Sequence, residues 1–262
     1  MNIGKTNKAC IPKKRKVDQM KEITDKIGFF DIVDKRRSVR IFDQESDFDH
    51  DVVKKCLEAA VLAPNSSNMQ LWEFYRVPES SLLKAPLSML CMGQKAAITA
   101  RELVVIVTRR KLWKVRAKAN LAYIRECYKD ADPKKQKRAM GYYRNLVPKF
   151  YANYPLWSVI KQVIAWFVGL KRPMVRQVSD CDVRVSLHKS AALAAMTFMY
   201  GMQAEGYDTC PMEGFDSKRV KKLLNMPKDA EINMIIGCGK GLPEGVYGKR
   251  FRVPIEEVIF ER

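Results

Sequence analysis

The chain has 262 residues, of which 47% are hydrophobic, so it is long and apolar enough to fold around a packed core. Charged residues make up 29% and aromatic residues 10%, a composition that excludes wholesale disorder. The net charge of +19 favours partners of opposite charge, among which nucleic acid, an anionic membrane and a phosphate-bearing cofactor all fit.

The seven cysteines are scattered and include no Cys-x-x-Cys pair, which argues against a disulfide framework or a zinc site and favours a reducing compartment. With only His50 and His188 available, we expect no histidine-rich metal site. The N-terminus lacks the long apolar run of a secretory signal, so a cytoplasmic protein is expected. Residues 1–18 are predicted to form a flexible basic tail. Within it, 12–17 resemble a nuclear import signal of a kind that arises often by chance in a basic chain.

The first predicted element is a helix through 29–33. Acidic cap candidates at 47–51 precede apolar residues at helical spacing, which predict a helix over 52–61. That helix must end near Pro64, because proline disfavours helix in the residue before it. The segment 72–77 alternates between apolar and polar residues, as a half-buried strand does.

The continuous, mostly β-branched run 103–107 predicts a central strand buried on both faces. A helix rich in alanine and methionine is predicted over 186–204, with Gly206 as its C-terminal cap; it is apolar nearly all round, so we expect it to be buried. A further strand is predicted over 232–236. Strands and helices mix without strict βαβ alternation, which favours an α+β fold over a doubly wound sheet.

Residues 111–181 differ in composition and are predicted to be an insertion into a single domain that spans 19–262. From 109 to 149 there are fourteen Lys or Arg against three Asp or Glu, a run typical of a solvated helical face. The segment 154–170 is strongly apolar but short for a membrane span. We interpret it as a helix that covers a pocket or packs on a partner subunit. Weak contact with a membrane surface is the alternative.

Four separated motifs carry the candidate chemistry. They are Arg-Arg-Ser-x-Arg at 36–40, Ala-Pro-Asn-Ser-Ser-Asn-x-Gln at 63–70, Cys-Pro-Met-Glu-Gly-Phe at 210–215 and Arg-x-Arg-x-Pro at 250–254. Guanidinium groups make bidentate bonds to phosphate, and a serine adds a hydroxyl donor. Each motif alone also fits an ordinary surface patch or turn.

Together, the four motifs occur in the order and approximate spacing of the nitroreductase family, which the chain resembles over about 28–110 and 182–260. The resemblance implies an α+β, nitroreductase-like fold with a mixed, mainly antiparallel sheet flanked by helices. It also implies an intertwined homodimer that holds two FMN molecules, with helix 186–204 in the dimer core and the C-terminal segment extending over the partner. The segment 111–181 has no counterpart in the resemblance.

The resemblance also implies the cofactor contacts. Arg36, Ser38, Arg250 and Arg252 are expected around the FMN phosphate, with Arg37 in the same loop and Arg40 at the pyrimidine edge of the ring. Pro64, Asn65, Ser66, Asn68 and Gln70 are expected to reach the flavin from the partner subunit. Pro211, Met212, Glu213 and Gly214 are expected to line one face of the ring, with a backbone N–H near Glu213 facing flavin N5. No side chain is expected to act as a catalytic nucleophile, because flavin chemistry requires none.

The implied activity is hydride transfer from NADH or NADPH, through FMN, to a nitroaromatic, quinone or enone acceptor by a ping-pong mechanism. A reductive dehalogenase or a flavin-fragmenting enzyme of the same fold is the nearest alternative, although Glu126, Tyr128 and Lys129 do not have the spacing of a dehalogenase lid. A non-catalytic module that binds nucleic acid or membrane through its basic surface is the alternative from another class, with nucleic acid the less expected partner.

Some residues depart from the family pattern or invite other interpretations. Leu71 stands where the family usually has proline, and Asn65 where it often has serine, which leaves the loop shape open. Gln94 and Lys95 stand where the family places polar residues that contact the ring. Glycines at 237–241 are interpreted as a strand exit instead of a nucleotide loop, and Cys210 as a small buried thiol.

Overall fold

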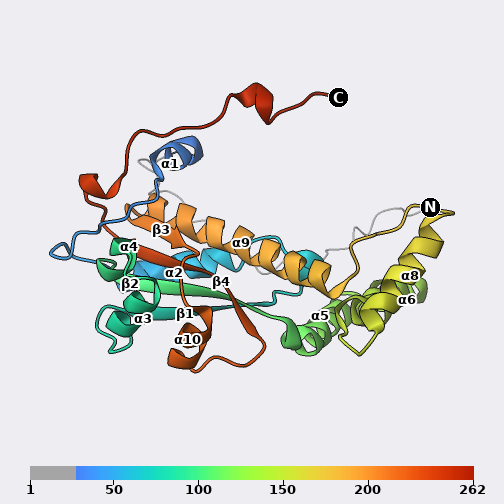
Figure 1. The fold of residues 1–262 in the computed structure, drawn as a ribbon. Helices are drawn as coiled ribbons and strands as arrows, with labels where there is room; N and C mark the ends of the chain where they lie inside the picture. The colour runs from blue at the N-terminus through green and yellow to red at the C-terminus, as the bar shows by residue number, and fades with distance from the viewer. Residues whose placement is uncertain (1–27) are drawn as a thin grey trace, which may run out of the picture.

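The computed structural model describes residues 28–262, and an antiparallel sheet lies at its centre (Figure 1). Its four strands run in the order β1 (Trp72–Pro78), β2 (Glu102–Arg109), β4 (Ala230–Gly239) and β3 (Asp208–Met212). Each neighbouring pair is antiparallel, while a parallel bridge joins Ser38 to Thr209 beside β3. The predicted α+β class and mainly antiparallel sheet are therefore confirmed. The predicted tail 1–18 and the basic run 12–17 lie outside the described residues.

Helices cover both faces of the sheet. They are α1 (Phe29–Lys35), α2 (His50–Ala60), α3 (Lys84–Leu90), α4 (Lys95–Ile98), α5 (Trp113–Cys127), α6 (Pro133–Gly141), α7 (Val147–Tyr151), α8 (Trp157–Gly169), α9 (Asp180–Ala204) and α10 (Ser217–Leu223), with shorter helical turns at Ser66–Asn68, Arg110–Leu112, Tyr142–Leu146, Pro243–Gly245 and Ile255–Glu257. Helices α2 and α9 pack on one face, whereas α3, α4 and α10 pack on the other (Figure 1). The sheet is thus the middle of three layers.

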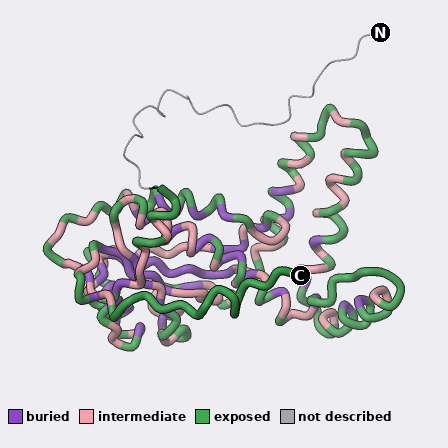
Figure 2. Tube along the Cα trace, turned by 90° about the horizontal axis from the view of Figure 1, so that it is seen from above, coloured by how far each residue is buried: buried purple, intermediate pink, exposed green. Residues whose placement is uncertain are grey.

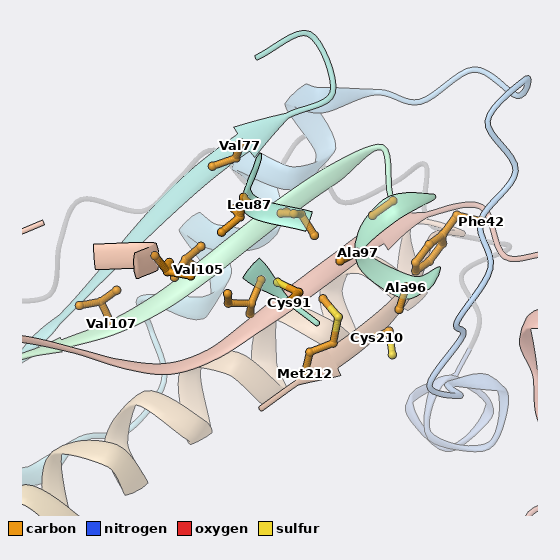
Figure 3. Close-up of a cluster of buried hydrophobic side chains, with 14 of the residues drawn as sticks. Phe42, Val77, Leu87, Cys91, Ala96, Ala97, Val105, Val107, Cys210 and Met212 are labelled. Atoms are coloured by element: carbon orange, nitrogen blue, oxygen red, sulfur yellow. The ribbon is translucent and has the colours of Figure 1, made fainter. Parts of the chain in front are cut away.

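Strand β2 shows why the sheet is buried on both sides. Its side chains alternate between faces, so Leu103, Val105 and Val107 join the core under α3 and α4 (Figure 3), while Val104 and Ile106 join the core under α2 and α9. All five are fully buried. The continuous apolar run predicted this central position correctly.

Helix α9 is longer and less buried than its sequence suggests. It begins at Asp180 behind a capping box in which Ser179 and Asp182 bond each other's backbone, six residues before the predicted start. One face, with Ala194 and Phe198, is fully buried against the sheet. The opposite face is uncovered, and Leu193 is 48% exposed there. Within residues 28–262 of one chain, α9 is therefore buried on one face only, and the burial of its other face in the expected dimer core stays a prediction.

Gly237 explains part of the glycine-rich segment 237–241. It lies inside β4, which ends at Gly239, three residues beyond the end of the predicted strand 232–236. A Cβ atom at Gly237 would lie 2.5 Å from the carbonyl oxygen of Ala96, so α4 can pack closely on the sheet only if residue 237 has no side chain.

The chain between β2 and α9 forms a group of helices, α5 to α8, beyond one end of the sheet (Figure 1). We call residues 110–178 the helical segment. It has a small core of its own that includes Ala117, Val147 and Tyr151, shared with Leu71 and Leu187. Figure 2 shows that intermediate and exposed residues predominate in this part of the chain. No helix between residues 28 and 262 is long and apolar enough to cross a membrane.

Candidate functional site

A basic pocket lies between two segments that are far apart in sequence, 36–40 and 247–252. Its cavity volume is about 190 Å³, and its lining consists of Arg36, Arg37, Ser38, Arg40, Tyr247, Arg250 and Arg252. No carboxylate lines it. The structure thus brings together the first and last motifs, which are more than 200 residues apart in sequence, and adds Tyr247.

The arginines of the basic pocket are held from the backbone. Arg250 donates to the carbonyl oxygens of Asp34 at 2.6 Å and Arg36 at 2.9 Å, and its guanidinium lies 3.5 Å from the Asp34 carboxylate. Arg37 donates to the carbonyl oxygen of Gly248 at 3.0 Å, and this bond joins the segment 36–40 to the segment 247–252. These bonds position positive charges on two separate stretches of chain around one cavity.

The surroundings of Arg36 and Arg40 differ from those of Arg37 and Arg250. Arg40 stacks over the Tyr247 ring at 4.9 Å. Burial lowers the pKa of Arg36, and the neighbouring positive charges of Arg250 and Arg252 lower it further, against an opposing effect of Tyr200. Among residues 28–262 the Arg36 guanidinium has no hydrogen bond or ion pair. A cluster of like charges without a carboxylate in its lining is the environment that a phosphate dianion would stabilise.

The segment 210–214 lies beside the basic pocket. Thr209 pairs with Ser38, and its buried hydroxyl oxygen has no hydrogen-bond partner among the described residues. Cys210 is buried, as expected; burial raises the pKa of its thiol, while Arg40 and Arg36 are close enough to lower it. Pro211 and Met212 end β3, and the exposed Glu213 and Gly214 follow them.

Gln94 positions this segment. Its side-chain amide donates to the carbonyl oxygen of Gly214 at 2.8 Å and to that of Cys91 at 2.9 Å. Gln94 therefore holds the backbone of the 210–214 segment from the start of α4, while Lys95 is the first residue of that helix. The prediction that these two residues contact the ring itself stays a prediction.

The polar loop 64–70 folds as a strained turn. Ser67, Asn68 and Gln70 have φ values of 56°, 51° and 49°, the left-handed region that non-glycine residues seldom adopt. Asn65 braces the turn, because its side-chain oxygen accepts from the backbone N–H of Gln70 at 2.8 Å. Asparagine at 65 thus has a structural role in this loop.

The loop 64–70 and the basic pocket lie at different points along α9. The backbone N–H of Ser66 donates to Ser190 Oγ at 3.2 Å, whereas Arg36 interacts electrostatically with Tyr200. At a rise of 1.5 Å per residue, those two positions on α9 are about 15 Å apart. One chain therefore does not unite the predicted phosphate residues with the predicted loop residues Pro64, Asn65, Ser66, Asn68 and Gln70.

Side chains of the helical segment 110–178 make hydrogen bonds to the polar loop 64–70. Tyr143 OH donates to the Ser67 carbonyl oxygen at 2.9 Å, and the hydroxyls of Tyr142 and Ser67 are 2.7 Å apart. Asn120 donates to the Asn68 carbonyl oxygen at 2.9 Å and accepts from the Asn68 amide at 2.8 Å. Sequence reasoning missed these residues, because nothing in a basic helical pattern marks the few side chains that turn inward.

An apolar cavity of about 620 Å³ lies within the helical segment, at the edge of the same loop. Its lining includes Ser66 and Ser67 on one side, and Phe150, Trp157 and Ile164 on the other. The prediction that the apolar stretch 154–170 forms a helix covering a pocket is consistent with this arrangement. By contrast, Glu126 and Lys129 pair with each other at 2.6 Å on the exposed surface.

These features define a class: an α+β protein with a phosphate-sized basic pocket and a separate polar loop beside an apolar cavity. A sequence model of the nitroreductase family matches residues 33–240. Protein DrgA from Synechocystis sp. is 31% identical over 236 residues, covering 88% of this chain and 94% of DrgA. The chain therefore belongs to the nitroreductase family.

Solved structures agree in fold. A nitroreductase family protein from Streptococcus pneumoniae TIGR4 has a TM-score of 0.66 at 21% identity, covering 90% of this chain and all of the other. A "putative nitroreductase in complex with FMN" from Exiguobacterium sibiricum 255-15 has a TM-score of 0.65 at 24% identity, covering 90% of this chain and 98% of the other. The nitroreductase-like fold inferred from the four motifs is thus confirmed.

Proposed function

We propose that the protein is an FMN-dependent oxidoreductase that takes hydride from NADH or NADPH, with the FMN phosphate in the basic pocket. The observation that carries the proposal is the Arg36 guanidinium, which has no hydrogen bond or ion pair within residues 28–262, in a pocket lined by five arginines and no carboxylate. A phosphate with up to two negative charges fits this charge and the cavity volume. The FMN complex of the Exiguobacterium relative, a protein of the same fold, supports the choice of cofactor.

The site is completed by a second copy of the chain in this proposal. The polar loop 64–70 lies too far from the basic pocket of its own chain, and an antiparallel partner across α9 would bring its loop to that pocket. The exposed apolar face of α9, with Val185 and Leu193, is available for such pairing. The C-terminal segment 250–262 is exposed throughout and extends away from the body, as an arm that lies on a partner would (Figure 1).

When bound, FMN would supply the hydride chemistry between the nicotinamide and the acceptor. Arg40, which shares the pocket and is held over Tyr247, would place positive charge at the pyrimidine edge of the ring. Gln94 would fix the 210–214 segment so that its backbone N–H near Glu213 faces the ring. Nicotinamide and acceptor would occupy the same exposed face in turn, which gives ping-pong kinetics.

We also propose that residues 111–181 are an insertion into one domain spanning 19–262 and that they form a wall of the acceptor site. The apolar cavity beside Ser66 and Ser67 supports this role, because the loop that contacts the cofactor would form its floor. A cavity of about 620 Å³ with this lining suits a bulky, flat acceptor such as a nitroaromatic, a quinone or an enone.

The absorbance spectrum of the purified protein tests the proposal directly. We expect bound FMN at one per chain, and loss of its visible absorbance when NADH or NADPH is added without oxygen. Initial rates at several nicotinamide concentrations should give parallel double-reciprocal lines against a quinone acceptor. A protein that takes up no FMN would contradict the cofactor assignment, whereas converging lines would contradict only the alternating mechanism.

A further inference from the structure

Helix α8 exposes large apolar side chains to the solvent and buries a lysine on its inner side. Of its 13 residues only Lys161 and Ala165 are buried. Five large apolar side chains that do not line the cavity are between 44% and 59% exposed, and we call them the apolar face of α8: Val159, Ile160, Val163, Trp166 and Phe167. A helix on a water-facing surface places its charges outward and its apolar residues inward, so this pattern requires another partner for the outer face.

The orientation of α8 is fixed by contacts on its inner side. Lys161 Nζ donates to the Phe150 carbonyl oxygen at 3.2 Å and lies 3.8 Å from the carboxylate of Asp180. Arg176 holds the end of the helix by donating to the carbonyl oxygens of Ala165 at 3.1 Å and Gly169 at 2.9 Å. Turning α8 to bury its apolar face would break the Lys161 contacts, so the exposure of that face is built into the fold.

The helical segment that carries this face is also the most basic part of the chain. Residues 110–178 hold seventeen Lys or Arg against three Asp or Glu, a net charge of +14 out of the +19 of the whole chain. Lys171 and Arg172 follow α8 directly, Lys149 lies shortly before it, and all three are exposed. Positive charge therefore flanks the apolar face at both ends.

Charge complementarity decides which partner covers this face. A second copy of the chain would bring two segments of +14 together, and like charges repel. Nucleic acid would satisfy the charges but would leave exposed isoleucines and valines without a favourable environment. A bilayer with anionic headgroups satisfies both features, because basic residues meet the headgroups while aromatic and aliphatic side chains enter the acyl boundary.

We propose that α8 docks the protein on an anionic phospholipid surface, lying in the plane of the interface with Trp166 and Phe167 inserted. At 1.5 Å per residue the helix is about 20 Å long, which suits a surface contact and not a span. This property goes beyond the redox activity and does not depend on it.

Vesicle sedimentation with the full chain tests the docking. We expect the protein to bind vesicles of phosphatidylcholine and phosphatidylglycerol, to bind pure phosphatidylcholine at least tenfold more weakly, and to be released by rising salt. Brominated lipid should quench tryptophan fluorescence only with the anionic vesicles. The double variant Trp166→Ser/Phe167→Ser keeps every charge and should lose at least tenfold in vesicle affinity together with the quenching.

A matched control uses apolar residues elsewhere that are more exposed than Trp166 and Phe167. Leu82 and Met89 are 93% and 68% exposed, and the double variant Leu82→Ser/Met89→Ser should bind vesicles like the parent chain. Circular dichroism checks that each variant is folded. The variant Lys171→Gln/Arg172→Gln should weaken binding and reduce its dependence on salt.

Three results would overturn the proposal. Vesicle binding that survives in Trp166→Ser/Phe167→Ser would assign it to charge alone. Absence of vesicle binding, with a change in sedimentation mass in that variant, would assign the apolar face to an interface between copies of the chain. Absence of vesicle binding, with tight and salt-sensitive binding of duplex DNA, would assign the segment to nucleic acid.

Discussion

The hydroxyl of Tyr151 donates a hydrogen bond to the hydroxyl oxygen of Ser66 at 3.1 Å, and so joins α7 to the polar loop 64–70. Tyr151 is almost fully buried, and burial raises the pKa of its hydroxyl, which therefore stays protonated as a donor at neutral pH. Through this bond the helical segment reaches the loop that the proposed function places on the cofactor. The segment is thus coupled to the site and is more than a peripheral addition.

Replacing Tyr151 by phenylalanine should loosen the loop without opening the core. The loss of one buried hydrogen bond costs about 1 kcal/mol, which we expect to appear as a severalfold rise in the KM for a quinone acceptor. Steady-state kinetics with FMN in excess measures it. Tyr154→Phe is the control, since Tyr154 is 59% exposed and should tolerate the change. Equal kinetics for both variants would show that the Tyr151 bond does not support the site.

Arg36→Gln should weaken FMN binding by about ten- to a hundredfold, the effect of losing a hydrogen bond from a charged group, about 1.5–3 kcal/mol. Fluorescence titration of the protein with FMN measures the dissociation constant. Arg219→Gln, on the exposed surface of α10, is the control and should leave the constant unchanged. The deficit of Arg36→Gln should also be smaller for riboflavin, which lacks the phosphate. An equal loss for both ligands would place Arg36 elsewhere in the site.

Leu193→Glu should separate the proposed dimer, because it places a charge on the exposed apolar face of α9. Sedimentation velocity should report a monomer, and absorbance at the flavin band should show that FMN is lost with it. Leu82→Glu adds the same charge to an exposed residue outside this face and should remain dimeric. A Leu193→Glu protein that sediments like the parent and keeps its FMN would rule out α9 as the interface.

Glu102→Gln should be strongly destabilising. The buried Glu102 carboxylate accepts from Arg76 at 2.6 Å and lies 2.6 Å from His50 Nδ1; its hydrogen bond raises the pKa of Arg76. Removing the charge leaves the Arg76 guanidinium without a carboxylate beside it, at a cost of about 3–5 kcal/mol, although the carbonyl oxygen of His50 still accepts from Arg76. Urea unfolding with saturating FMN measures it. The exposed pair of Glu126 and Lys129 gives the comparison, since Glu126→Gln should cost less than about 1 kcal/mol.

Asp208 should make the protein less stable as pH rises. Burial raises the pKa of its carboxyl, against the opposing hydrogen bond from the backbone N–H of Gly241 at 3.0 Å. The folded chain then holds this proton more tightly than the unfolded chain does. Stability is therefore lost as pH rises from the unfolded pKa, near 4, through the folded value, and does not return above it.

Asp208→Asn should consequently raise the melting temperature at pH 7, because the folded chain then no longer has to keep a buried carboxylate ionised. Thermal unfolding followed by circular dichroism at pH 7 and below pH 4 measures the difference, which should vanish at the lower pH. Asp130→Asn changes an exposed carboxylate and serves as control. A gain at pH 7 that persists below pH 4 would assign the effect to the asparagine itself.

Much of the fold could be predicted from sequence periodicity. The run around Val105 is apolar at every position and is buried on both faces, and Asp49 caps α2 as expected. The short strand β3 was missed because it is an edge strand of five residues containing Pro211, which lacks the donor that a ladder needs. Short helices such as α4, with four residues, carry too little periodic pattern to be detected.

The candidate site could be predicted only in part. Five predicted arginines and Ser38 do converge on one pocket, since a charged motif survives as a pattern in the sequence. Tyr247 was missed because a single aromatic residue three positions before Arg250 has no distinctive signal. Lys161 was missed for another reason. The periodicity of α8 predicts that the apolar side of the helix faces inward, whereas the contact with Asp180 holds Lys161 on the inner side.

The separation of the basic pocket from the polar loop along α9 has a genetic consequence. If each site takes its arginines from one chain and its loop from the other, two different damaged chains can repair one another. A chain altered at Arg36 and a chain altered at Asn65 would each form defective homodimers. Mixed together, they would form heterodimers in which one site carries both lesions and the other carries neither, so that half of the sites in each mixed pair regain the parental architecture by subunit complementation.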